Sequence, residues 1–72
     1  MDYGSIDNPR ALGTLVRQRR KELGLTQTQL ADVAMTTLRF ISELERGKPS
    51  AQMDGVFRVL SALGIRLDAG RR

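Results

Sequence analysis

The chain has 72 residues, enough for one domain around a small hydrophobic core. It contains no cysteine and no histidine, which excludes disulfide bonds and leaves no thiol or imidazole ligand for a zinc site. Twelve lysines and arginines against eight acidic residues give a net charge of +4, which favours a polyanionic partner such as nucleic acid, although basic charge also serves solubility.

No apolar run is long enough to span a bilayer, so we expect no contact with a membrane. Residues 1–7 lack the basic and apolar regions of a signal peptide. These features predict a soluble cytoplasmic protein. The low aromatic content, with one tyrosine and two phenylalanines, argues against single-strand binding by base stacking.

Residues 1–8 show no periodic pattern and are interpreted as a flexible N-terminal arm. Asn8 followed by Pro9 predicts a helix start, and the first helix is expected from Pro9 to Leu23, closed by Gly24. Its apolar positions predict a buried stripe that consists of Leu12, Leu15, Val16 and Leu23. Its many cations form either a solvated face or contacts to phosphate.

The segment from Thr26 to Gly47 predicts two short helices joined by a tight turn. Thr26 and Gln29 have the spacing of a capping box at the start of a helix expected over residues 27–34. Thr37 is a candidate cap for a helix over residues 38–46, which Gly47 ends in a left-handed conformation. The expected buried residues of the two helices are Leu30, Ala31, Val33, Ala34, Phe40, Ile41 and Leu44.

A fourth helix is expected over residues 51–63, followed by Gly64. Its apolar residues recur at steps of three and four and predict a core-facing stripe of Met53, Val56, Phe57, Leu60 and Leu63. Gly55 inside this helix costs about 1 kcal/mol relative to alanine, and the sequence provides no reason for it.

The C-terminal segment alternates apolar and polar residues and predicts a short strand made of Ile65, Arg66, Leu67, Asp68 and Ala69. A lone strand leaves its backbone groups unpaired, and pairing with the same strand of a second copy would create a twofold homodimer. A frayed terminus is the alternative. The expected organisation is an arm over residues 1–8, a domain over 9–64, and a dimerisation strand and tail over 65–72.

Residues 10–64 resemble the Xre/Cro-repressor class of helix-turn-helix proteins. The motifs that carry the resemblance are LGLTQ, LAD, ISELERGK and VLSALG at the separations typical of the class. The tail IRLDAG narrows it to the HipB-type antitoxins, which end in a strand paired between subunits. The resemblance implies an all-α, four-helix, lambda-repressor-like domain with a short C-terminal β-strand that pairs across a dimer.

This resemblance implies roles for individual residues. The helix over residues 38–46 would be the recognition helix that enters the DNA major groove. Base contacts are expected from Thr37, Leu38, Arg39, Ser42 and Glu43. Arg39 can donate two hydrogen bonds to one guanine. Glu43 either accepts a hydrogen bond from cytosine or is a solvated charge that repels DNA. Phosphate contacts are expected from Arg17, Gln27, Arg46 and Lys48, and an internal salt bridge from Arg20 and Glu45.

The sequence departs from the class in two places. Where the class usually has a small residue and then an apolar one in the turn, this chain has Met35 and Thr36, and methionine disfavours the positive φ that such a turn requires. Gly55 stands where the class has a better helix former.

The function implied is a dimeric repressor that binds a palindromic operator, restrains a HipA-like kinase toxin as its antitoxin, and regulates its own operon. An enzyme is excluded because the sequence has no histidine, no cysteine and no paired-carboxylate or phosphate-loop motif. We therefore expect no cofactor, no metal and no small-molecule substrate. An interaction module without DNA binding, and a stand-alone or phage-type repressor without a toxin, remain as alternatives.

Overall fold

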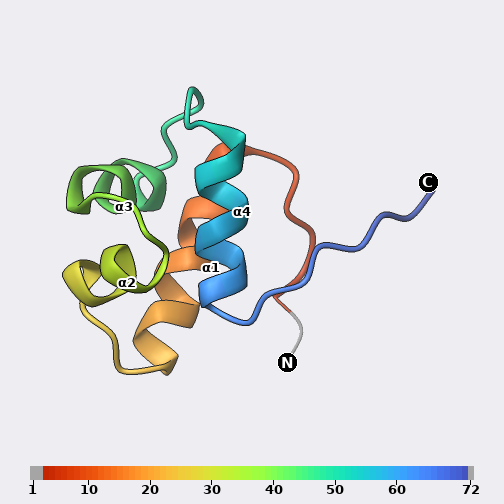
Figure 1. Cartoon of the computed structure of the whole chain (residues 1–72). Coiled ribbons are helices and arrows are strands. Elements are labelled where there is room, and N and C mark those ends of the chain that lie inside the picture. The colour runs from red at the N-terminus through yellow and green to blue at the C-terminus, as the bar shows by residue number, and fades with distance from the viewer. Residues whose placement is uncertain (1–2, 72) are drawn as a thin grey trace.

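The computed structural model describes residues 3–71 and contains, within that range, four helices and no strand (Figure 1). The helices are α1 (Pro9–Glu22), α2 (Gln27–Val33), α3 (Leu38–Glu45) and α4 (Met53–Ala62). All four were predicted, and each ends one residue earlier than expected because the last predicted residue is its C-cap. None of the helices described is long and apolar enough to cross a membrane.

Three of the helices begin at the side-chain caps that the sequence predicts. The Asn8 side chain accepts from the Ala11 amide, and Thr37 accepts from the Phe40 amide. Thr26 and Gln29 form the complete capping box, each side chain accepting from the other residue's backbone N–H. The fourth helix, α4, has no side-chain cap and starts two residues later than predicted.

All four helices end in the same way. In each, two successive backbone amides donate back to carbonyls of the last turn, and the first donor residue has a positive φ, which is the Schellman motif. Gly24, Gly47 and Gly64 occupy this left-handed position after α1, α3 and α4, with φ of 71°, 83° and 71°. After α2 the position is held by Met35, with φ of 57°, the single non-glycine residue with positive φ in the part of the chain described.

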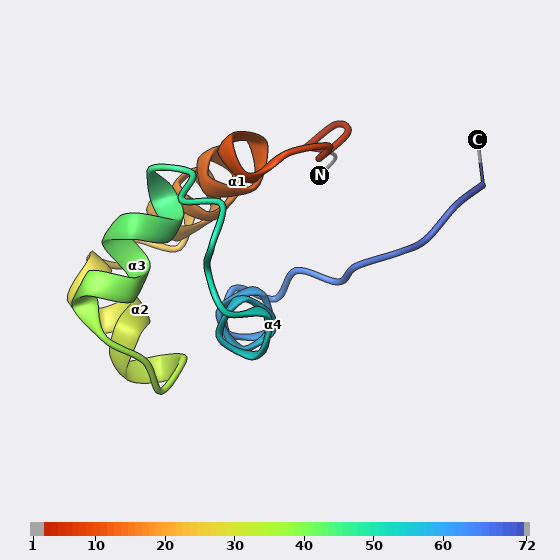
Figure 2. The same ribbon diagram turned by 90° about the horizontal axis from the view of Figure 1, so that it is seen from above.

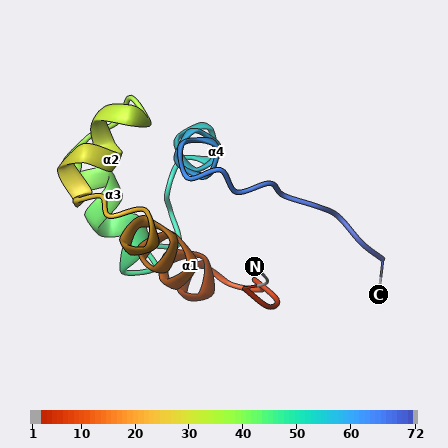
Figure 3. The same ribbon diagram turned by 90° about the horizontal axis from the view of Figure 1, so that it is seen from below.

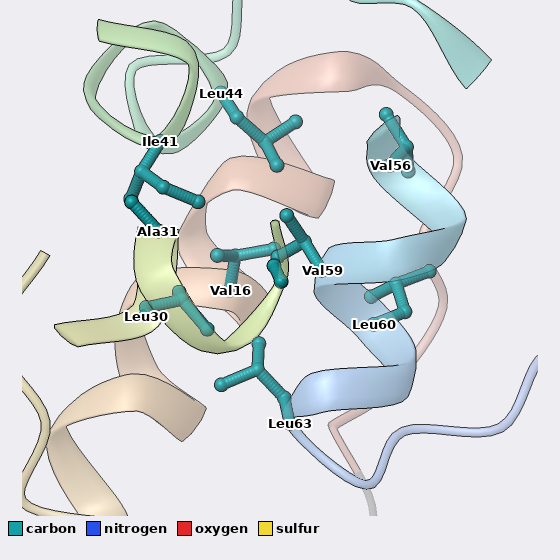
Figure 4. Close-up of a cluster of buried hydrophobic side chains, with 10 residues drawn as sticks. Val16, Leu30, Ala31, Ile41, Leu44, Val56, Val59, Leu60 and Leu63 are labelled. Atoms are coloured by element: carbon teal, nitrogen blue, oxygen red, sulfur yellow. The ribbon is translucent and has the colours of Figure 1, made fainter. Parts of the chain in front are cut away.

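The core is formed by all four helices, as the close-up in Figure 4 shows. Val16 of α1, Ile41 of α3 and Val59 of α4 are fully buried. The other buried members are Leu30, Ala31, Ala34, Leu44, Val56, Leu60 and Leu63. Val59 was not predicted, because the buried stripe of α4 is rotated from the expected one.

Four residues that were predicted to be buried are exposed. Leu23 is 43% exposed, Val33 61%, Met53 63% and Phe57 51%. A helix on the surface of a small bundle buries only one stripe, so apolar residues at its margins remain in contact with solvent.

Two glycines allow helices to approach each other closely. A Cβ built on Gly55 would lie 2.7 Å from Phe40 Cζ. The Phe40 ring of α3 therefore packs directly against the backbone of α4 at this glycine. This contact explains the glycine for which the sequence provided no reason. Gly13 of α1 is buried against the last turn of α3, where an added Cβ would lie 2.7 Å from the Glu45 carbonyl oxygen.

The two terminal segments leave the helices on the side opposite α2 and α3 (Figures 2 and 3). Ile65 packs against the core, but residues 66–71 extend away from the domain. The strand expected over residues 65–69 is not formed within this chain, because a strand requires a neighbouring strand and no described segment lies beside the tail to pair with it.

Candidate DNA-binding surface

The N-terminal turn of α3 presents the side chains that were expected to read bases. Thr37, Leu38 and Arg39 are all exposed there, with 84% of the Arg39 side chain accessible to solvent. Leu38 is 51% exposed, so this apolar side chain is not part of the core. Ser42 and Glu43, one turn further along, are partly buried. The five residues thus lie along one helix, and the most accessible of them lie at its beginning.

Glu43 is flanked by two of the cations expected to contact DNA. Its carboxylate lies 3.2 Å from Lys48 Nζ and 3.4 Å from Arg39 Nε. The hydrogen bond from Lys48, followed by the weaker influence of Arg39, lowers the pKa of Glu43 below its usual value. The negative charge is therefore compensated locally, and Arg39 and Lys48 are held on either side of it.

The Glu43 carboxyl should titrate below its usual value near 4.5, and Lys48→Ala should raise the midpoint more than Arg39→Ala. Because the folded-state pKa is lowered, these pairs stabilise the fold above the unfolded-state pKa, and their contribution is lost as the pH falls through the folded-state pKa. A carbon NMR titration of the carboxyl group measures the midpoint. Equal midpoints in the wild type and Lys48→Ala would contradict this role of Lys48.

A hydrogen-bonded ion pair joins α1 to the end of α3. Arg20 donates from Nε to Glu45 Oε2 at 2.6 Å and from Nη2 to Glu45 Oε1 at 3.0 Å. Its third nitrogen donates to the Leu25 carbonyl at 2.9 Å, in the loop that leads into α2. The side chains of Arg20 and Glu45 are only 11% and 4% exposed, and the hydrogen bond to Glu45 raises the pKa of Arg20. The pair fixes α3 relative to α1 and α2.

Gln27, at the first position of α2, joins the same network. Its Nε2 donates to Glu45 Oε1 at 3.1 Å, and the side chain is partly buried. The amide was expected to contact DNA phosphate, and a primary amide has a second hydrogen that this bond does not use. Gln27 therefore bridges α2 and α3.

The remaining cations expected to contact phosphate, Arg17, Arg46 and Lys48, are exposed. The first backbone amides of the loop after α3 are not free to bind phosphate. The amides of Arg46, Gly47 and Lys48 donate to carbonyls at the end of α3. In this part of the loop, phosphate contacts can therefore come only from the side chains of Arg46 and Lys48.

Two arginines have structural roles that the sequence did not reveal. Arg19 Nε donates to the Leu63 carbonyl at 2.9 Å, and Arg58 Nε donates to the Ala34 carbonyl at 3.2 Å. Each cation thereby satisfies the C-cap carbonyl of another helix, where the helix dipole also favours positive charge. From the sequence alone both arginines resemble the solvated cations around them.

A family model described as helix-turn-helix matches residues 16–69. The chain belongs to the helix-turn-helix family. Its relatives include the uncharacterized HTH-type transcriptional regulator y4mF of Sinorhizobium fredii, 51% identical over 63 residues, which are 88% of this chain and 83% of the relative. An uncharacterized HTH-type transcriptional regulator of Methanothermobacter thermautotrophicus is 45% identical over 71% of this chain and 74% of its own length. This helix-turn-helix protein is thus a DNA-binding transcriptional regulator, which is not an enzyme class.

Solved structures agree on the fold. A HipB-O4 20mer complex superposes with a TM-score of 0.86 at 22% identity, covering 94% of this chain and 96% of the other. A HipA-HipB-O2-O3 complex superposes with a TM-score of 0.87 at 22% identity and the same coverage. The resemblance to the Xre/Cro class is confirmed, and the helix-turn-helix fold described above is that of the HipB chains.

Proposed function

We propose that this helix-turn-helix protein is a homodimeric, sequence-specific repressor that binds a palindromic operator in its own promoter with α3 in the major groove. The observation that carries the proposal is the exposed beginning of α3, where Leu38 and Arg39 extend from a rigidly held helix. An exposed arginine at this position can make the bidentate hydrogen bonds that identify guanine. Leu38 can contact a thymine methyl group.

The other assigned residues complete this surface. Thr37 and Ser42 serve base edges or phosphate, and Glu43 accepts from cytosine or holds its two neighbouring cations in place. Arg46 and Lys48 follow α3 directly and approach the flanking phosphates, as does the exposed Arg17 of α1. Gln27 directs its second amide hydrogen to phosphate while it remains bonded to Glu45.

The proposed dimer pairs the tails of two chains over residues 65–69. Two recognition helices in such a dimer must lie about one DNA turn apart, roughly 34 Å. Support comes from the tail itself, which extends away from the domain with its backbone accessible (Figure 2). A palindromic operator then follows from the twofold symmetry of the protein.

We further propose that the repressor acts as the antitoxin of a HipA-like kinase toxin. Support comes from the fold, which is shared with HipB chains in complexes with 20mer DNA and with HipA. The alternative is a stand-alone or phage-type repressor with no toxin. Co-expression with a kinase encoded next to this protein distinguishes them: a stable complex that inhibits the kinase supports the antitoxin role, and an unaffected kinase contradicts it.

Replacing Arg39 by alanine should lower discrimination at one base pair of each half-site by about 1–3 kcal/mol. Lys48→Ala should instead weaken binding to operator and random DNA alike and reduce the salt dependence. Fluorescence anisotropy on the upstream DNA and on a scrambled duplex, at two salt concentrations, measures both effects.

The two variants serve as each other's control, because both remove one cation beside Glu43. If Arg39→Ala weakens binding equally on both DNAs, the base-reading role of Arg39 is wrong. If the wild type itself does not distinguish the two DNAs, the proposal of an autoregulatory operator fails.

A further inference from the structure

The tail carries its charges in a self-complementary order. Ile65, Leu67 and Ala69 alternate with Arg66 and Asp68, so an extended backbone directs the apolar residues to one face and the two charges to the other. Ile65 packs against the core, whereas Leu67 on the same face is 53% exposed because the tail leaves the domain after residue 65. The side chains of Arg66 and Asp68 are 84% and 73% exposed.

The backbone of this segment is open to a second strand. None of the amides of residues 66–71 donates a backbone hydrogen bond within the described chain, whereas the preceding amide of Ile65 donates to Leu60. A groove of about 1130 Å³ separates residues 64–70 from the N-terminal arm, with Leu15 and Arg19 between them. A second strand would lie about 4.8 Å from the tail, and this groove is open space beside it.

We propose that two copies of this chain pair their tails as antiparallel strands with Leu67 on the twofold axis, so that Arg66 of each copy faces Asp68 of the other. This inference rests on the proposed homodimer and specifies its register. Opposite residues of an antiparallel pair share a face, so the register joins the apolar residues with one another and forms two equivalent cross-strand ion pairs.

The neighbouring registers are less favourable. An axis at residue 66 brings the two arginines opposite each other, and an axis at residue 68 does the same for the two aspartates. A parallel, in-register pair aligns both sets of like charges. A shift of one residue along the strand directs apolar side chains to the face of the charged ones. The Leu67 register is the one among these that satisfies both the apolar pattern and the charges.

In the single chain Arg66 and Asp68 pair with each other, with Arg66 Nη2 3.2 Å from Asp68 Oδ2. Dimerisation would exchange this internal pair for two pairs between subunits. A variant that carries only one reversed charge loses both kinds of pair, so the two effects must be separated by the design of the experiment.

The test uses Arg66→Asp and Asp68→Arg, alone, mixed and combined in one chain. Each single variant faces its own copy with two pairs of like charges, and its dimer dissociation constant should rise about tenfold or more. In a 1:1 mixture, aspartates of one chain face arginines of the other, so heterodimers should form at close to the wild-type concentration. The mixture contains no internal Arg–Asp pair, so its recovery isolates the contact between subunits.

Sedimentation equilibrium with one variant carrying a fluorescent label measures these populations, and a chain without residues 65–72 provides the monomer reference. The combined variant should dimerise like the wild type, and circular dichroism should be unchanged throughout because both side chains are exposed. Dimeric single variants, or a mixture without heterodimers, would overturn the register but not the dimer. A monomeric wild type would contradict both the dimer and its register. A chain without residues 65–72 that still dimerises would show that the dimer interface does not involve the tail.

Discussion

Replacing Arg20 by alanine should lower the free energy of unfolding by about 3 kcal/mol. The substitution leaves the Glu45 carboxylate, only 4% exposed, without its two charge-assisted hydrogen bonds. One bond from Gln27 remains, which is too little to replace an ion pair. Chemical denaturation with urea measures the loss, and the thermal midpoint should fall by roughly 12–24 °C for a domain of this size.

Arg17→Ala is the matched control, because it removes an exposed arginine from the same helix and should change stability by less than about 0.5 kcal/mol. Combining Arg20→Ala with Glu45→Gln should recover part of the loss, since the unpaired charge is then removed. A loss no greater than that of Arg17→Ala would mean that the ion pair contributes little beyond orienting α3.

Replacing Gly13 by alanine should destabilise the protein by about 1–3 kcal/mol although alanine is the better helix former. The new Cβ would lie 2.7 Å from the Glu45 carbonyl oxygen and 2.9 Å from its carbonyl carbon. Backbone atoms cannot rotate away as a side chain can, so α1 and α3 must separate. DNA affinity should fall as well, because the helix that is displaced is the proposed recognition helix.

Gly70→Ala is the control for this substitution, since a Cβ at that position meets nothing within 4 Å. The free energy of unfolding from urea titrations and operator affinity from anisotropy should be compared for the two variants. An unchanged or more stable Gly13→Ala protein would show that the helices separate at no cost.

Most of the fold could be predicted from local chemistry. Asn8, Thr26 and Thr37 were predicted to cap helices, and each does so in the structure. These predictions succeed because a cap bond joins residues only three positions apart. The glycines likewise predicted the ends of α1 and α4, which stop just before Gly24 and Gly64. These signals require no knowledge of how the helices pack.

What the sequence could not predict depends on contacts between distant segments. Val59 and Phe57 are both apolar and nearly adjacent, and only the packing of α4 against the other helices buries the first and exposes the second. The same holds for Arg19 and Arg58, whose roles depend on carbonyl groups 44 and 24 residues away. The roles of the α3 side chains on DNA are predictions that the measurements above address.

The left-handed Met35 has a consequence for how the DNA-binding unit holds together. A non-glycine residue in this conformation costs about 1–2 kcal/mol, and α2 and α3, with seven and eight residues, are too short to be stable helices in isolation. The helix-turn-helix segment therefore cannot persist as an autonomous folding unit and depends on α1 and α4 for its shape. Any event that opens the core also abolishes the proposed DNA-binding surface, so binding to the proposed operator should fall in proportion to the folded fraction of the protein.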